Sequence, residues 1–106
     1  MTTANSDLSD VMQPVARAKG LPNAHYIDPA AFDEERKSVL FANWSGVGFA
    51  KDVPNEGDAM PVDFLGVPLL ILRDHDGAVR VYQNTCRHRG MILVDEPRNI
   101  RGTIRC

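Results

Sequence analysis

The sequence has 106 residues, the length of one ordinary domain, and its 43% hydrophobic content is enough for a modest core. Twelve basic and 14 acidic residues leave a net charge of −2, which argues against a nucleic-acid-binding module, since such modules normally carry a basic patch. The N-terminus lacks the basic and apolar regions of a secretory signal, and no stretch approaches the roughly 18 apolar residues of a membrane span. These features predict a cytoplasmic protein that binds neither nucleic acid nor membrane.

The first part of the chain predicts a leader and a helix. Residues 1–27 are polar and are interrupted by prolines and a glycine, so we expect a flexible leader. Residues 28–43 predict an N-terminal helix, in which Asp28 is suited to the cap and Pro29 to the first helical position. Acidic residues follow within the first turns, where the helix dipole favours negative charge.

After residue 44 the pattern changes to short strands rich in valine and other apolar residues. Strands are predicted at 45–50, 59–64, 67–73 and 79–83, with a further strand starting at Ile104. Turn residues fill 54–57 and 74–77, and the second turn should close a hairpin between the third and fourth strands. The predicted fold class is therefore mainly β. The N-terminal helix precedes an incomplete antiparallel sandwich or barrel over residues 44–106, whose end loops carry the functional site.

The strongest candidate for chemistry is the run Cys86-Arg87-His88-Arg89-Gly90 together with Cys106, which follows His88 after a gap of 17 residues. Two cysteines in a chain without a secretory signal are more often reduced thiols or metal ligands than a disulfide. A 2Fe–2S cluster of the mixed kind takes two thiolates on one iron and two imidazoles on the other. Cys86, His88 and Cys106 are accordingly the candidate cofactor-binding and metal-ligating residues.

Three other interpretations fit these residues less well. Structural zinc sites favour cysteine pairs two to four residues apart, whereas a Cys-x-His pair with a long gap is unusual. A catalytic Cys86 with His88 as its base would need an orienting third group and an oxyanion site, and the sequence offers neither. Two unrelated buried thiols would leave the spacing of His88 and Cys106 unexplained. We predict no catalytic residue in this chain.

Two further motifs are better explained by backbone geometry. Gly46-Val47-Gly48 is not followed by the helix that a nucleotide-binding glycine loop requires. Asp74-His75-Asp76 precedes Gly77, and such a run is typical of a tight turn rather than of a metal site.

The stretch from Asn84 to Met91 resembles the first ligand loop of the large (alpha) subunit of Rieske non-haem iron oxygenases. The likeness extends upstream through the Asp28-Pro29 helix and covers most of residues 20–106. Rieske ferredoxins usually carry proline at the position of Arg87. Respiratory Rieske proteins carry an extra cysteine at the position of Met91, so the resemblance is to the oxygenase type.

This resemblance implies that Cys86 and Cys106 ligate one iron of a Rieske 2Fe–2S cluster and that His88 ligates the outer iron. The family pattern places the second histidine three residues past Cys106. We therefore expect the chain to be an N-terminal fragment whose Rieske domain is truncated on its C-terminal side.

The resemblance also implies the activity of the parent protein. Electrons from a reductase or ferredoxin would pass through the cluster to a mononuclear non-haem Fe(II) in a further domain. That iron would use dioxygen to hydroxylate or oxidatively demethylate a small organic substrate. The parent is expected to be a homo-oligomer, such as a trimer, or to pair with a beta subunit, and the 106 residues alone should be inactive. The alternative is a stand-alone Rieske electron carrier.

Overall fold

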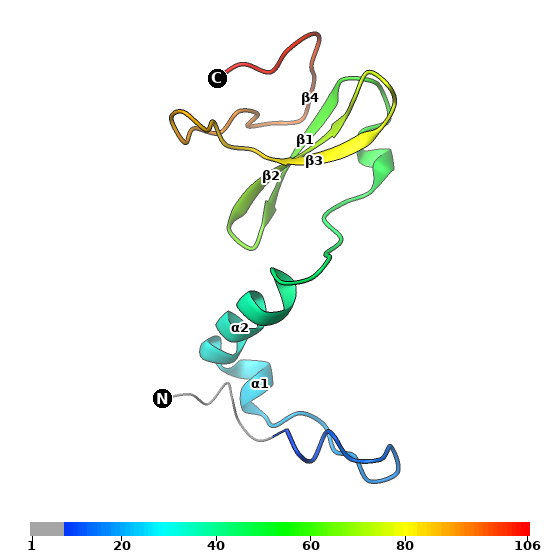
Figure 1. Ribbon diagram of the computed structural model, residues 1–106, viewed down its shortest axis with the longest axis vertical. Coiled ribbons are helices and arrows are strands. Elements are labelled where there is room, and N and C mark those ends of the chain that lie inside the picture. Colours follow the sequence, from blue (N-terminus) through cyan, green and yellow to red (C-terminus); the bar gives the residue numbers. More distant parts are fainter. Residues whose placement is uncertain (1–7) are drawn as a thin grey trace. The chain divides into compact units, whose positions relative to one another are not determined.

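The computed structural model describes residues 8–106, so the first seven residues of the predicted leader lie outside the described chain (Figure 1). The chain divides into two compact units, Met1–Ser45 and Gly46–Cys106. The α-helices belong to the first unit and the antiparallel sheet to the second, which confirms the predicted fold class.

The first unit contains a capped helix at the predicted position. Helix α2 spans Pro29–Glu35, and the Asp28 carboxylate caps it by accepting a hydrogen bond of 2.9 Å from the Ala30 amide. Pro29 occupies the first turn, where its missing N–H costs no hydrogen bond. A short helix, α1 (Ala24–Ile27), precedes α2 and was not predicted.

The helix continues beyond α2 as a π-helical turn, η2 (Arg36–Leu40), and ends earlier than the predicted residue 43. The Phe41 amide bonds to the Arg36 carbonyl at 2.9 Å, which is the wider spacing of a π-turn. The Asn43 side chain then donates to the Val39 carbonyl at 2.8 Å, and this satisfies one of the exposed carbonyls at the helix end.

The predicted strand at 45–50 is wrong. Residues 45–49 belong to no strand, and a 3₁₀ turn, η3 (Ala50–Asp52), follows them. The Asp52 carboxylate accepts a hydrogen bond of 2.9 Å from the Phe49 amide, so a local side-chain contact replaces pairing with a strand. Gly48 passes so near Ile71 that an added Cβ would lie 2.6 Å from the Ile71 Cδ1 atom.

The second unit is built on an antiparallel sheet. The described residues form β1 (Asp58–Phe64), β2 (Val67–Arg73), β3 (Val79–Gln83) and β4 (Arg98–Asn99), in the order β3-β2-β1-β4. The predictions at 59–64, 67–73 and 79–83 are confirmed. The strand expected from Ile104 is wrong, because no ladder in the described chain includes residues 101–106. Strand β4, only two residues long, was not predicted.

The core of this unit lies where the sheet meets the segments that follow it. Ala59, Leu70 and Val94 are buried together, and Ile100 and Ile104 pack against them while partly exposed. Ile104 therefore packs on the sheet without joining a strand.

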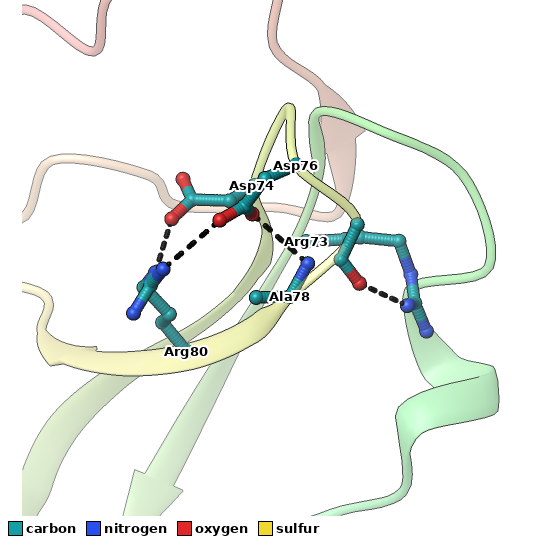
Figure 2. A network of polar contacts seen from close by, with 6 residues as sticks. Arg73, Asp74, Asp76, Ala78 and Arg80 are labelled. Atoms are coloured by element: carbon teal, nitrogen blue, oxygen red, sulfur yellow. Dashed lines mark hydrogen bonds and ion pairs between the residues drawn. The ribbon is translucent and has the colours of Figure 1, made fainter.

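The β2–β3 hairpin closes at Asp74–Gly77 as predicted, with hydrogen bonds from the Asp74 amide to Ala78 (2.8 Å) and from the Gly77 amide to Asp74 (3.0 Å). Figure 2 shows the Arg80 guanidinium between the carboxylates of Asp74 and Asp76. The Ala78 amide holds the pKa of Asp76 below its usual value, with a further contribution from Arg80.

Arg73, at the end of β2, ties three segments together. Its guanidinium donates to the carbonyls of Val53 (2.5 Å), Gly77 (2.7 Å) and Ala50 (3.0 Å). Figure 2 shows this side chain turned away from Arg80. The planar fork of arginine suits several acceptors at once, so Arg73 holds η3 and the hairpin turn on the same strand.

Within residues 8–106, every helix is too short or too polar to cross a bilayer.

Candidate metal centre

The candidate ligand loop begins where β3 ends, and a buried asparagine holds its base closed. Asn84 is only 2% exposed. Its side-chain amide donates to the Val94 carbonyl at 2.6 Å, and its side-chain oxygen accepts from the Val94 amide at 2.9 Å. The backbone N–H of Asn84 also donates to the Pro68 carbonyl at 2.9 Å. Hydrogen bonds thus hold the two ends of the loop, Asn84 and Val94, together beside the start of β2.

Backbone hydrogen bonds then fold the loop tightly around Cys86. Thr85 and Ile92 form an isolated antiparallel bridge. The Cys86 amide donates to the Met91 carbonyl, and the Gly90 amide donates to the Cys86 carbonyl, both at 2.7 Å. Gly90 has φ +69°, and an added Cβ would meet no atom within 4 Å, so backbone conformation rather than space favours glycine there.

The sulfur atom of Cys86 lies among hydrogen-bond donors. The backbone N–H of Arg89, the thiol of Cys106 and the backbone N–H of His88 lower the pKa of Cys86, in that order of importance. The same contact raises the pKa of Cys106, whose thiol donates to the Cys86 sulfur. Both cysteines are free. Since a thiolate is the form that binds metal, this pair of adjacent sulfurs fits the chemistry of an iron–sulfur site.

A second set of contacts brings Cys106 to this position. The Ile100 amide donates to the Gly57 carbonyl at 2.7 Å, and the Gly57 amide donates to the Arg73 carbonyl at 2.8 Å. Gly57 has φ +81°, and a Cβ there would overlap the Ile100 carbonyl oxygen. Only glycine therefore allows the chain from Ile100 to Cys106 to run so close to the 54–57 turn.

The neighbouring residue Asn99 strengthens this attachment. Its side-chain amide donates to the Glu56 carbonyl at 2.8 Å and to the Asp58 carboxylate at 2.9 Å. Two hydrogen bonds hold the pKa of the Asp58 carboxyl below its usual value. The larger effect comes from the side-chain amide of Asn99, and the next from the backbone N–H of Asn55. The charged form of Asp58 thus contributes to the junction of β1 and β4.

The structure brings together two of the three predicted ligands. Cys86 and Cys106 adjoin each other, whereas the exposed His88 does not join them: among residues 8–106, no three His, Cys, Asp or Glu side chains gather closely enough to hold one metal ion. Sequence reasoning missed the role of Asn84 at the base of the loop. A polar residue gives no periodic signal of burial, so only its place beside the Cys86 motif could have drawn attention to it.

An apolar groove of about 420 Å³ runs beside the ligand loop. Leu70, Leu72 and Tyr82 line it from the sheet, while Arg87 lines it from the loop. Residues 102–104 form part of the same groove, so the last segment of the chain and the ligand loop border one surface.

Residues 43–106 match the model of the Rieske [2Fe-2S] domain. The chain is 33% identical over 94 residues to the alpha subunit of 2-aminobenzenesulfonate 2,3-dioxygenase from Alcaligenes sp, a match that covers 89% of this chain and 24% of the relative. It is 27% identical over 86 residues to the oxygenase subunit of carnitine monooxygenase from Escherichia coli (strain K12), covering 81% of this chain and 23% of the relative. The chain thus spans about a quarter of the length of these relatives.

Solved structures show the same fold. A naphthalene 1,2-dioxygenase from Rhodococcus sp. bound to indole superposes with a TM-score of 0.68 at 29% identity, covering 76% of this chain and 18% of that one. The quaternary ammonium Rieske monooxygenase CntA in complex with L-carnitine superposes with a TM-score of 0.75 at 24% identity. That match covers 84% of this chain and 25% of the CntA chain.

Proposed function

Because the chain belongs to the Rieske [2Fe-2S] domain family, we propose that it holds the electron-accepting cluster of a non-haem iron oxygenase, with Cys86, His88 and Cys106 as ligands. The observation that carries this proposal is the pair of sulfurs, Cys86 and Cys106, at a loop whose backbone N–H groups face the Cys86 sulfur. Residues 44–106 would be the cluster-binding domain.

Each ligand has a separate part in this proposal. The thiolates of Cys86 and Cys106 would hold one iron, and His88 would hold the other together with a second histidine, which the family pattern places three residues past Cys106. A bound cluster of this type takes up and releases single electrons at a potential set by its ligands, hydrogen bonds and exposure. The N–H groups of His88 and Arg89 would stabilise negative charge on the Cys86 sulfur.

The relatives suggest the wider reaction. They are oxygenase subunits, and they include both dioxygenases and monooxygenases. We propose that the parent protein passes electrons to a mononuclear non-haem Fe(II) outside these 106 residues. That iron would use dioxygen to hydroxylate or demethylate a small organic substrate. The parent would act in the cytoplasm as a homo-oligomer or with a beta subunit, and the 106 residues alone would be inactive.

The charge around the site suggests the chemistry of the electron donor. Residues 86–106 contain five arginines and two carboxylates, a balance of +3, although the whole chain carries −2. Arg87, Arg89, Arg101 and Arg105 are exposed, and none forms an ion pair within the described residues, whereas Arg98 pairs with Asp95. A reductase or ferredoxin with an acidic surface would be attracted to this arginine-rich segment.

This idea has a direct kinetic test. Arg101→Glu and Arg105→Glu should slow reduction of the cluster by the donor and flatten its dependence on salt. Arg17→Glu, which makes the same charge change in the first unit, should leave the rate unchanged. Equal effects from all three substitutions would contradict a local docking surface.

The ligand assignment is tested on the full-length protein after iron–sulfur reconstitution. His88→Ala should abolish the visible absorbance and the Rieske-type EPR signal of the reduced protein, as should Cys86→Ser. His75→Ala is the matched control, because His75 is also an exposed histidine in this unit. An unchanged EPR signal in His88→Ala would overturn the assignment, and a colourless, zinc-containing wild-type protein would overturn the cluster itself.

A further inference from the structure

We infer that Asn84 is a positioning residue, whose buried carboxamide closes the ligand loop and thereby sets the hydrogen bonds to the Cys86 sulfur and the reduction potential of the cluster. This inference rests on the proposed function. Asn84 would touch neither iron nor substrate; it would act through the loop that it closes.

The first step of the argument is the burial of the amide. Asn84 is 2% exposed and Val94, its partner, is 1% exposed. The two residues exchange two hydrogen bonds, at 2.6 Å and 2.9 Å, so the Asn84 side-chain nitrogen and oxygen and the Val94 N–H and C=O each have a partner within the protein. A buried and fully satisfied polar contact is costly to break, because the groups left behind keep their desolvation penalty.

The second step is the chemistry of the side chain. Asparagine carries a donor and an acceptor on one short planar group, so it can pair with both the N–H and the C=O of a single residue. In this way the side chain of Asn84 acts like the backbone of a strand at a point where β3 has already ended at Gln83. Leucine has nearly the same size but neither function, and serine is too short to make both bonds.

The third step connects this pair to the cluster site. Thr85 alone separates Asn84 from Cys86, and Thr85 forms its bridge with Ile92, two residues before Val94. The Cys86 amide bonds to Met91 inside that bridge, and the N–H groups of His88 and Arg89 lie between these two residues and face the sulfur. The bonds at Asn84, at Thr85 and at Cys86 therefore form successive rungs of one small ladder. Loss of the outermost rung should loosen the inner ones.

The last step gives the direction of the effect. Hydrogen bonds from N–H groups to cluster sulfurs favour the reduced form, because that form carries the extra negative charge. If the loop opens, these bonds lengthen and the reduction potential falls. If loss of these hydrogen bonds lowers the equilibrium constant for reduction of the cluster about tenfold, the potential of this one-electron couple falls by about 59 mV.

The test uses the reconstituted full-length protein, with Asn84→Leu and the milder Asn84→Ser. Redox titration followed by EPR should show a lower potential in both variants, by about 59 mV for a tenfold effect in Asn84→Leu and by less in Asn84→Ser. Hydrogen exchange should speed up at residues 85–94 and not in the β1–β2 hairpin. Arg73→Lys is the control, because the Arg73 side chain also donates hydrogen bonds to backbone carbonyls in this unit, outside both the ligand loop and the attachment of the Cys106 segment. It should reduce stability while leaving the potential unchanged.

The outcomes separate the two proposals. A wild-type protein without a Rieske-type EPR signal would overturn the proposed function. A normal wild-type signal together with a wild-type potential in both Asn84 variants would overturn only the positioning role. A potential that falls equally in Arg73→Lys would do the same, because the effect would then follow general destabilisation.

Discussion

Gly57 allows the segment that ends in Cys106 to lie against the 54–57 turn, and Gly57→Ala should detach it. The residue has φ +81°, a conformation that costs a residue with a Cβ about 1–2 kcal/mol. The new Cβ would also overlap the Ile100 carbonyl oxygen, which belongs to the backbone and cannot turn away as a side chain could. Loss of the 2.7 Å bond from the Ile100 amide to Gly57 adds about 1 kcal/mol. We expect a total local cost of about 2–3 kcal/mol.

Gly77→Ala is the matched control for this prediction. Gly77 has nearly the same φ, +84°, but an added Cβ would meet no atom within 4 Å. Gly77→Ala should therefore destabilise the protein only through the positive φ, by about 1–2 kcal/mol, and only at the β2–β3 hairpin turn.

Hydrogen exchange of the full-length protein measures both variants. Gly57→Ala should speed up exchange of the Ile100 amide by about 30-fold to 150-fold, which corresponds to the expected 2–3 kcal/mol. It should also weaken cluster retention, because Cys106 follows on the detached segment. Gly77→Ala should change neither property. Equal exchange of the Ile100 amide in the two variants would refute the argument that close approach, rather than φ alone, requires glycine at position 57.

Three other predictions concern the framework around the site. Arg73→Lys should lower the free energy of unfolding by about 2 kcal/mol, because a lysine cannot donate hydrogen bonds to all three backbone carbonyls in this geometry. Urea unfolding measures this free energy, and a loss no larger than that of Arg80→Lys, at an exposed arginine, would contradict the prediction. The Asn99 amide lowers the pKa of Asp58 from 3.8, so the advantage of wild type over Asp58→Asn should be present above pH 3.8 and disappear as the pH falls through the lowered pKa. Urea midpoints from pH 7 to pH 2.5 that keep a constant difference would be inconsistent with this linkage. His75→Ala should change stability by no more than about 0.5 kcal/mol and leave iron content unchanged, because turn-tip substitutions rarely do more; loss of iron would reveal a metal site at the hairpin.

Local chemistry made the elements with short-range hydrogen bonds predictable. Asp28 and Pro29 mark the start of α2 because the cap forms within three residues of the chain. The β2–β3 hairpin follows from the turn at 74–77, whose bonds join residues no more than four apart. Cys86 and His88 stood out as candidate ligands for the same reason, since their spacing lies within one loop.

The tertiary structure decided what depends on residues far apart in the chain. The segment at 45–50 has the composition of a strand but pairs with no strand among the described residues, and η3 follows it, where the Asp52 carboxylate accepts a hydrogen bond from the Phe49 amide. Strand β4 is too short to carry a pattern and exists because β1 pairs with it. Asn84 is buried because Val94 returns to it, and Cys106 reaches Cys86 because the chain passes Gly57. The sequence thus determined which groups could act as ligands, whereas long-range packing determined which of them meet, because contacts between distant residues leave no periodic trace in the chain.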